Sequence, residues 1–186
     1  KLFAEKGFAD ADTQELANRL AIAKGTLYRY FPSKQDLFFA AVERGTQQLR
    51  EWIAERAPLV EDGLAMMAKA TEAALEFFER KPEIVELIVL ERAHFKKRQS
   101  TFFARTDPDF ECHWHTVLGR LMETGRLKSM PATKLMDLLG DMIFGTMFSN
   151  YFSGRPSDFR EQAKAIVDVV FLGVLTDSER ERWNAR

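Results

Sequence analysis

The chain has 186 residues, of which 46% are hydrophobic and 30% are charged. This length and composition allow one core with a smaller accessory domain and exclude a mainly disordered chain. The formal net charge of −1 excludes the uniformly basic surface common among nucleic-acid-binding proteins. The charge is unevenly spread, however, because residues 1–50 hold eight lysines and arginines against six acidic residues, whereas residues 51–186 hold nineteen against twenty-two.

Several features bear on where the protein resides. A single cysteine, Cys112, excludes an intrachain disulfide and agrees with a reducing compartment. No signal-peptide pattern is found, and the longest uncharged run, Met142 to Gly154, is shorter than the roughly 18 residues expected of a membrane span. We therefore expect a soluble cytoplasmic protein without a membrane partner. Since the chain opens on Lys1 inside a helix-like run, we also expect a segment before it.

Helical periodicity dominates the first fifty residues, and no strand alternation is found. A first helix ends at Gly7, a residue suited to a helix C-terminus. Asp12 then begins a second helix, which runs to about Leu20, and after a tight turn a third, short helix spans residues 24–30. Pro32 ends that helix, and residues 33–36 form an S-x-x-D capping box that opens a long fourth helix to about residue 53.

The remaining chain also has helical spacing, and we expect about nine helices in total, an all-α fold. Pro82 is suited to the first turn of a helix, and the run that follows it is apolar nearly all round, so a buried strand is the alternative there. Two last long helices are expected over residues 132–152 and 157–175. Apolar residues share a face in two further segments: Leu64, Met67, Thr71, Ala74 and Phe78, and Phe110, Trp114, Val117 and Leu121.

The second and third helices have the arrangement of a helix-turn-helix motif, in which the second helix enters the major groove of DNA. We expect Ala17 and Leu20 to pack the second helix on the third. The residues left on the outer side of the third helix are then Lys24, Gly25, Thr26 and Tyr28.

Each residue type on that outer side has a chemical reason to meet DNA. The Lys24 ammonium can donate to guanine O6 and N7, and the Thr26 methyl can touch a thymine methyl. Gly25 allows close backbone approach. Phosphate contacts, which position the protein without reading sequence, are expected from Thr13, at a helix N-terminus, and from Tyr28, Tyr30 and Lys34. Arg29 is expected to point away from the groove.

The runs "LFAEKGF" and "TQELANRLAIAKGTLYRYFPSKQDLF" together resemble the DNA-binding domain of the tetracycline-repressor (TetR) family of bacterial regulators, over about the first 45 residues. One departure is Ala21, where the family commonly has glycine. The resemblance implies a DNA-binding domain at residues 1–46 and a ligand-binding and dimerisation domain at residues 47–186. It places DNA contacts on Thr13, Gln14, Lys24, Gly25, Thr26, Tyr28, Tyr30 and Lys34.

The implied function is a nucleoid-associated transcriptional regulator, a repressor that binds a near-palindromic operator as a homodimer and is released by a small apolar ligand. A short reading helix covers too few base pairs alone, and a two-fold axis would supply a second one. The broad apolar stripes of the last two long helices indicate the interface. Its expected residues are Leu139, Met142, Ile143, Thr146, Met147, Ile166, Val167, Val170, Phe171 and Val174.

The resemblance also implies a pocket for a small molecule of unknown identity. The sixteen phenylalanines and seven methionines of the chain indicate apolar or aromatic walls with few polar groups. Candidate wall residues are Phe77, Phe78, Phe102, Phe103, Phe110, Trp114, Phe148 and Tyr151. Glu91 and His94, one turn apart, are candidate polar anchors.

Two other classes of function are compatible with parts of the sequence. A helical metal-dependent hydrolase could use Cys112 and His115, which share a helix face, with Glu91 and His94; His113 would point elsewhere. A protein-binding adaptor would explain the apolar helices but would leave Lys24 and its neighbours without a role. No glycine-rich phosphate loop, nucleophile elbow or HExxH motif is found. We therefore expect no enzyme activity, no metal and no cofactor.

Overall fold

The structure, a computed structural model, describes residues 1–57, 62–98, 100–102, 108–154 and 158–185. These residues form ten helices and no strand, which confirms the expected all-α fold. The helices are α1 (Leu2–Asp10), α2 (Thr13–Arg19), α3 (Lys24–Tyr30), α4 (Lys34–Arg56), α5 (Gly63–Arg80), α6 (Pro82–His94), α7 (Pro108–Glu123), α8 (Ala132–Ser153), α9 (Phe159–Val174) and α10 (Asp177–Asn184). The additional helix is α10, whose sequence DSERERWN has almost no apolar periodicity to mark it.

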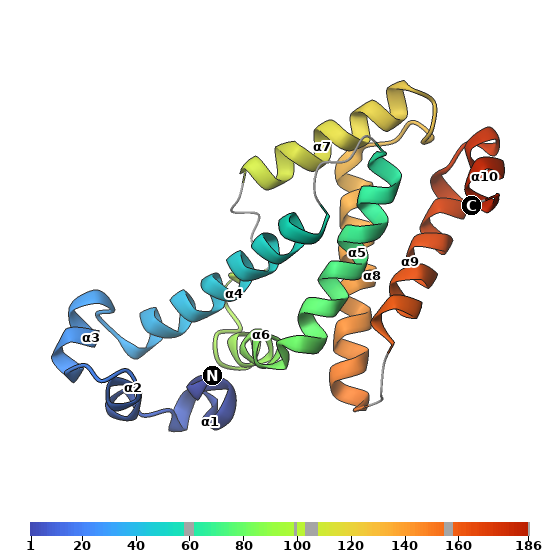
Figure 1. Cartoon of the computed structure of the whole chain (residues 1–186). Helices are drawn as coiled ribbons and strands as arrows, with labels where there is room; N and C mark the ends of the chain where they lie inside the picture. Colours follow the sequence, from blue (N-terminus) through green and yellow to red (C-terminus); the bar gives the residue numbers. More distant parts are fainter. Residues whose placement is uncertain (58–61, 99, 103–107, 155–157, 186) are drawn as a thin grey trace. The chain divides into compact units, whose positions relative to one another are not determined.

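The chain divides into two compact units (Figure 1). Unit 1 comprises Lys1–Gln48 and Lys81–Ala104, and unit 2 comprises Leu49–Arg80 and Arg105–Arg186. Helix α4 begins in unit 1 and ends in unit 2, and α6 returns to unit 1, where it lies against α1. Compactness does not say which residues bind DNA, so the functional boundary near residue 46 stays a prediction.

Unit 1 is held together by an aromatic cluster shared by α1, α4 and α6. The ring of Phe38 meets the rings of Phe3 and Phe8 edge-on, with centroid distances of 5.2 Å and 5.3 Å. The ring centroid of Phe95 lies 4.8 Å from that of Phe39 and 5.0 Å from that of Phe8. Such aromatic pairs contribute roughly 0.5–1.5 kcal/mol each beyond their burial. The cluster therefore packs α1 against the start of α4 and the end of α6.

The break in the first helix lies where the sequence predicted it. Gly7 has φ 76° and ψ 171°, a conformation reserved almost entirely for glycine, so regular helix ends there and a further turn follows. At the expected capping box, the Ser33 hydroxyl accepts from the Asp36 N–H at 3.1 Å, as an N-cap side chain does, and donates to the Asp36 carboxylate at 2.7 Å.

Unit 2 packs α5 against α7, α8 and α9 around one core. The core contains buried apolar residues from all four helices, among them Leu64, Leu118, Leu135 and Phe171. In the described part of the chain, no helix combines the length and apolarity that a bilayer span requires.

A charge network around the buried Glu179 connects three parts of unit 2. Arg126, between α7 and α8, donates to Asp62 at 3.0 Å and to Glu179 of α10 at 2.8 Å. The hydrogen bond from Arg126 is the largest cause that lowers the pKa of Glu179, and the same bond raises the pKa of Arg126. The network therefore joins the start of α5, the α7–α8 connection and α10 through one guanidinium.

Candidate nucleic-acid interface

Helices α2 and α3 pack through a small buried seam. Asp12 caps α2 by accepting from the Gln14 N–H at 2.8 Å, and Ala17 and Leu27 are buried between the two helices. The expectation that Leu20 joins this seam was wrong, since its side chain is 56% exposed. Helix α2 ends at Arg19, and the chain turns away directly after Leu20, before any neighbour can cover that side chain.

The turn between the two helices is strained at Ala21. Ala21 has φ 53° and is the one described non-glycine residue with positive φ. A left-handed backbone costs an L-residue roughly 1–2 kcal/mol. The tight turn is kept by hydrogen bonds from the N–H groups of Ala21 and Ile22 back to Asn18 and Ala17.

The predicted contact residues of helix α3 differ in exposure. Lys24 and Thr26 are half-buried, and Gly25, Tyr28 and Tyr30 are exposed, Tyr30 by 70%. Lys24 makes no ion pair with any described residue. A Cβ added at Gly25 would meet no atom within 4 Å, so the space in front of this backbone is open.

Two of the candidate contact residues are joined to each other. The Thr13 hydroxyl lies 3.0 Å from the Tyr28 hydroxyl, which ties the start of α2 to α3. One of these hydroxyls donates in that bond, and the proton of the other remains available for an outside acceptor. The Thr13 side chain is buried, whereas Tyr28 is exposed. Tyr28 is therefore the member of the pair that can donate to a phosphate oxygen, while its bond with Thr13 holds the two helices together.

Other candidate contacts already have partners within unit 1. Lys34 donates to the Ala9 carbonyl at 2.8 Å and lies 5.3 Å from the centre of the Phe8 ring. An ammonium has three protons, so Lys34 can still donate elsewhere. Gln14 donates to Asn18 along the exposed side of α2.

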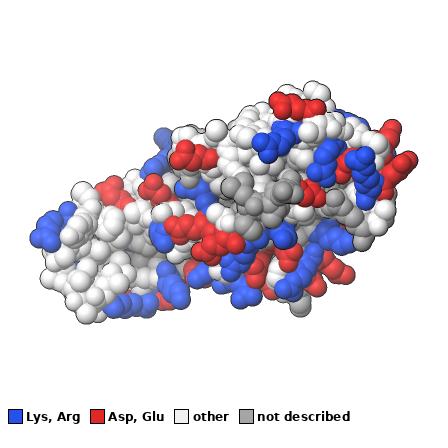
Figure 2. All heavy atoms as spheres, turned by 45° about the horizontal axis from the view of Figure 1, so that its top comes forward, with Lys and Arg blue, Asp and Glu red and all other residues white. Residues whose placement is uncertain are grey.

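Charge is sparse over this surface. Figure 2 shows mostly uncharged atoms in the region of α2 and α3, with a few lysine and arginine groups at its margin. Beside it, Lys6 and Arg19 are paired with Glu5 and Glu15, and the hydrogen bond from Lys6 is the largest cause that lowers the pKa of Glu15. Arg29 lies 5.4 Å from the ring centre of Tyr30.

Unit 2 contains an apolar cavity of about 210 Å³. Three of the candidate pocket residues line it, namely Phe78, Phe110 and Trp114. The other lining residues were not predicted as pocket residues. The sequence did indicate that three of them, Met67, Thr71 and Ala74, share one face of a helix. The complete lining is Leu49, Ile53, Met67, Ala70, Thr71, Ala74, Phe78, Phe110, Trp114, Leu118, Met136, Leu139, Gly140, Ile143 and Phe144.

The other candidate pocket residues do not line that cavity. Phe77 is buried against Trp52, and Phe148 and Tyr151 lie beside Phe152 on α8. Phe102 is buried in unit 1. Phe103 lies outside the described residues.

The two candidate polar anchors both belong to unit 1. Glu91 is buried and accepts from the Ser100 hydroxyl at 2.6 Å and the Thr101 N–H at 2.9 Å. His94 is exposed and lies 5.4 Å from the Phe8 ring. Glu91 is thus occupied in holding the segment after α6.

The candidate interface residues differ in burial. Those of α9, namely Ile166, Val167, Val170, Phe171 and Val174, are buried in the core of unit 2. On α8, Met147 is buried, whereas Leu139, Met142, Ile143 and Thr146 are half-buried. Large apolar side chains are exposed elsewhere on these helices: Leu138 and Phe152 on α8, and Val169 and Leu172 on α9.

The residues of the alternative metal site are not gathered. Cys112 is exposed on α7. Among the described residues, no group of three or more histidine, cysteine, aspartate or glutamate side chains could hold a metal ion.

Comparison with known proteins points to one family. The family model described as bacterial regulatory proteins, tetR family, matches residues 1–41. A nucleoid occlusion factor, SlmA of Haemophilus ducreyi, is 32% identical over 108 residues, which are 55% of this chain and 53% of that protein. The chain thus spans about half the length of the first curated relatives it matches.

Two further matches extend along almost the whole chain. An uncharacterized HTH-type transcriptional regulator of Bacillus subtilis, YvaF, is 26% identical over 97% of this chain and 94% of its own length. The solved structure of the transcriptional regulator FadR from Bacillus subtilis, in complex with stearoyl-CoA, superposes with a TM-score of 0.68 over 91% of this chain and 92% of that one. At 13% identity, this last match shows a shared fold.

Proposed function

The chain belongs to the TetR family of bacterial regulatory proteins, and from this premise we propose that it regulates transcription by placing α3 in the major groove of an operator. The observation that carries the proposal is the open outer side of α3. There Lys24, Gly25 and Tyr28 face outward beside a capped α2, which is the geometry of a reading helix. We propose that residues 1–46 are the part that contacts DNA. We also propose that the protein is associated with the nucleoid in a bacterial cytoplasm.

The roles of the side chains follow from their chemistry. Lys24 and Thr26 read base edges. Tyr30, Lys34 and the hydroxyl pair of Thr13 and Tyr28 hold phosphates and set the register. Gln14 adds a contact from α2. Because the face drawn in Figure 2 carries few charges over α2 and α3, we expect a shallow dependence of affinity on salt, with few counterions released.

Selection of bound fragments from a random duplex pool tests this proposal. The expected result is an inverted repeat whose half-sites lie about one helical turn, or a multiple of it, apart. Binding of the selected duplex should weaken as salt is raised. Enrichment of no sequence, together with no binding to duplex DNA at low salt, would contradict the proposal.

We propose further that the regulator acts as a homodimer through the outer side of α8 and α9. Leu138, Phe152 and Val169 are exposed there by 47%, 69% and 61%. Between them on α8 lies Gly145, which is exposed and has no atom within 4 Å of an added Cβ. A glycine in a helix interior costs about 1 kcal/mol relative to alanine, and a second helix approaching closely at this position would justify it.

Light scattering after gel filtration at micromolar concentration tests the dimer. The wild-type chain is expected at twice its 21.4 kDa mass. Gly145→Arg should give a monomer, because the side chain would fill the space that the partner needs, whereas Thr116→Arg on the exposed side of α7 should leave the dimer intact. A monomeric wild type, or a dimer that survives Gly145→Arg, would refute this interface.

A small apolar effector is proposed to bind the cavity of unit 2 and to release the regulator, a repressor, from its operator. The cavity is smaller than the usual range of about 300–1,000 Å³ and has almost no polar lining apart from Thr71 and Trp114. It suits a single ring or a short acyl chain. The FadR structure contains stearoyl-CoA, which supports an acyl group as one ligand class.

Thermal-shift measurements with alcohols and aromatic hydrocarbons of increasing size test the cavity. Bound ligand stabilises the folded chain by mass action, so the melting temperature should rise with size until the cavity is full. Gly140→Leu fills the cavity from α8 and should abolish the rise, whereas Gly119→Leu on α7, outside the lining, should preserve it. Stabilisation by no apolar compound would contradict the proposal.

A further inference from the structure

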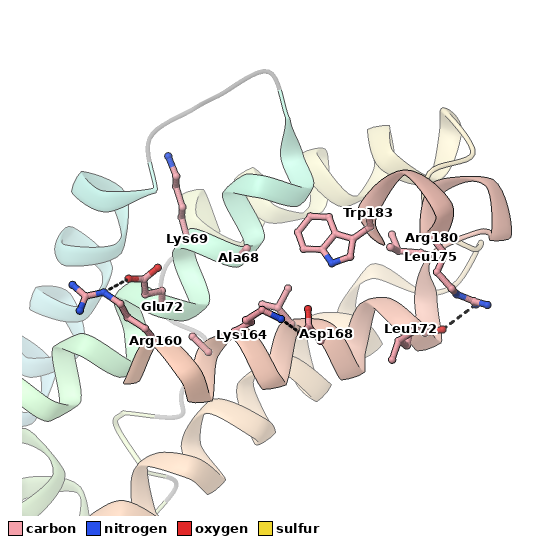
Figure 3. Close-up of a pocket in the computed structure, with 12 residues that line it drawn as sticks. Ala68, Lys69, Glu72, Arg160, Lys164, Asp168, Leu172, Leu175, Arg180 and Trp183 are labelled. Atoms are coloured by element: carbon pink, nitrogen blue, oxygen red, sulfur yellow. Dashed lines mark hydrogen bonds and ion pairs between the residues drawn. The ribbon is translucent and has the colours of Figure 1, made fainter. Parts of the chain in front are cut away.

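Most basic residues of a second hollow in unit 2 are already occupied. The hollow is a groove of about 580 Å³ between α5, α9 and α10 (Figure 3). Arg160 pairs there with Glu72 at 3.2 Å, and Lys164 pairs with Asp168. Arg180 donates to a backbone carbonyl of α9 at 3.0 Å. Three of the four basic residues that line the groove thus serve contacts within unit 2.

Unit 1 contains a run of cations that are not paired in this way. Residues 92–98, with the sequence RAHFKKR, include four lysines and arginines and no acidic residue. They carry a charge of +4, so the rest of a chain whose net charge is −1 carries −5. The four cationic side chains are exposed, and none of them makes an ion pair with a described residue. Such a concentration of unneutralised positive charge is a candidate contact for a polyanion.

The chain makes a tight turn over residues 95–98, directly after α6. The Arg98 N–H donates to the Phe95 carbonyl at 3.0 Å. This is the hydrogen bond of a four-residue turn, which places Lys96 and Lys97 at the two central positions. Both lysine side chains are exposed. This basic turn therefore carries its two lysines at the tip.

Contacts on both sides of the basic turn fix its position in unit 1. The Phe95 ring packs in the aromatic cluster, with centroid distances of 5.0 Å to Phe8 and 4.8 Å to Phe39. The Arg98 guanidinium lies over the Phe39 ring, 3.7 Å from its centre. The segment that follows the turn donates two hydrogen bonds to the buried Glu91 carboxylate. Because the backbone is already anchored, the lysines can meet a ligand at little further cost in backbone entropy.

The basic turn lies near a residue already proposed to hold a phosphate. The Lys34 ammonium and the His94 ring, at the end of α6, both lie within 5.4 Å of the centre of the Phe8 ring, so these two groups are at most about 11 Å apart. Each DNA strand carries one phosphate per roughly 3.4 Å of helix axis, so this distance corresponds to about three base pairs. Phosphates of one strand can therefore meet both Lys34 and the basic turn.

We propose that the basic turn binds the phosphate backbone of the duplex that α3 reads, an inference that rests on the proposed function. Lys96 and Lys97 hold phosphates about three base pairs from the one held by Lys34, without reading sequence. Arg92 and Arg98 add attraction at longer range. The turn thereby adds cations to a DNA-binding unit whose α2 and α3 carry few charges on the face drawn in Figure 2.

The salt dependence of binding to the selected operator tests the basic turn. Lys96→Ala combined with Lys97→Ala removes two phosphate contacts per subunit. The slope of log K against log salt concentration should then fall in magnitude by about 2 for each bound subunit. Between about 50 and 200 mM salt, the wild type should lose about tenfold more affinity than this double variant for each bound subunit. Base preference should stay unchanged, because only backbone contacts are removed.

The matched control combines Lys69→Ala with Arg120→Ala. It removes two exposed cations of unit 2 that make no ion pair with a described residue, so the net charge changes equally. Its salt slope should equal that of the wild type. Because all four substituted side chains are exposed, both double variants should keep the wild-type melting temperature.

Ethylation interference, which identifies the phosphates needed for binding, tests the position of the contact. The wild type should show sensitive phosphates about three base pairs from the one whose contact Lys34→Ala removes. The double variant at Lys96 and Lys97 should lose that sensitivity and keep the rest of the pattern.

Two results would overturn the proposal: an unchanged salt slope in the double variant at Lys96 and Lys97, which would leave the turn to an acidic protein partner, or an equal change in the control. If the wild-type chain binds no duplex DNA, the proposed function and this inference fail together. If it binds its operator with a slope that the substitutions do not alter, this inference alone fails.

Discussion

The helix pairs α2–α3 and α8–α9 differ in what determines their exposed surfaces. In α2–α3, short helices with few apolar residues are specified by local chemistry: the Asp12 cap, the tight turn at Ala21 and the proline after Phe31. In α8–α9, long helices carry apolar residues on more than one side, and packing against α5 decides which side is covered. Local signals thus determine the proposed reading surface, whereas tertiary packing determines the proposed dimer surface.

The largest expected effect tests how far unit 2 depends on long-range contacts. Arg126→Met should lower the free energy of unfolding by about 3 kcal/mol, because it leaves the buried Glu179 carboxylate without its main partner. Urea denaturation measures this loss. Arg182→Ala, which removes an exposed cation 3.4 Å from the same carboxylate, should cost less than about 0.5 kcal/mol.

The same network predicts a dependence on pH. Arg126 holds the pKa of Glu179 below its usual value of 4.5. Its contribution to stability is therefore complete above that usual value and is lost as the pH falls through the lowered pKa. The stability difference between wild type and Arg126→Met, measured by urea denaturation from pH 7 downward, should shrink below about pH 4.5. If the stability difference between wild type and Arg126→Met stays constant down to pH 3, the ionised Glu179 carboxylate is not its cause.

Substitutions on α3 test whether its outer side reads sequence. Lys24→Ala should relax base preference at one position of the operator by about 1–3 kcal/mol. Tyr30→Phe and Lys34→Ala should weaken binding to all sequences alike, and Arg29→Ala should change it least. Competition binding with single-base operator variants distinguishes these outcomes. Uniform weakening by Lys24→Ala would assign that lysine to a phosphate instead.

The turn offers a test of local strain. Ala21→Gly should raise the free energy of unfolding by about 1 kcal/mol, because glycine adopts the left-handed backbone without penalty. Thermal denaturation measures the gain. Ala11→Gly, at a buried position with φ −66°, is the control and should destabilise.

The smallest expected effect concerns the cap of α2. Asp12→Asn keeps the acceptor for the Gln14 N–H but removes a negative charge beside the proposed phosphate contact at Thr13. We expect unchanged stability and a gain of about twofold in operator affinity at low salt, the size of an exposed charge effect. Fluorescence anisotropy with labelled operator measures this change in affinity. Weaker binding by Asp12→Asn would indicate that Thr13 does not lie beside the phosphate backbone of the DNA.

Much of unit 1 could be predicted because its signals are local. The capping box at residues 33–36, the break at Gly7 and the short α3 before Pro32 each depend on residues within a few positions of one another. Leu20 was predicted wrongly because a helical spacing does not say whether a neighbour exists to cover the last turn. The partners of Thr13 and Lys34 were also missed, since both lie far away in the sequence.

By itself, the sequence determined the all-helical fold and the helix-turn-helix with its outward residues, because periodicity, caps and proline act over one or two turns. Only the tertiary structure decided that Ile166 and Val170 enter the core while Val169 and Leu172 stay exposed. The sequence shows that a helix has an apolar stripe, but it does not show which other helix will cover that stripe. The tertiary structure also decided that Trp183 and Arg180 of α10, a helix with little apolar signal, line a groove beside α5. The physical reason is that burial depends on neighbours brought together from distant parts of the chain.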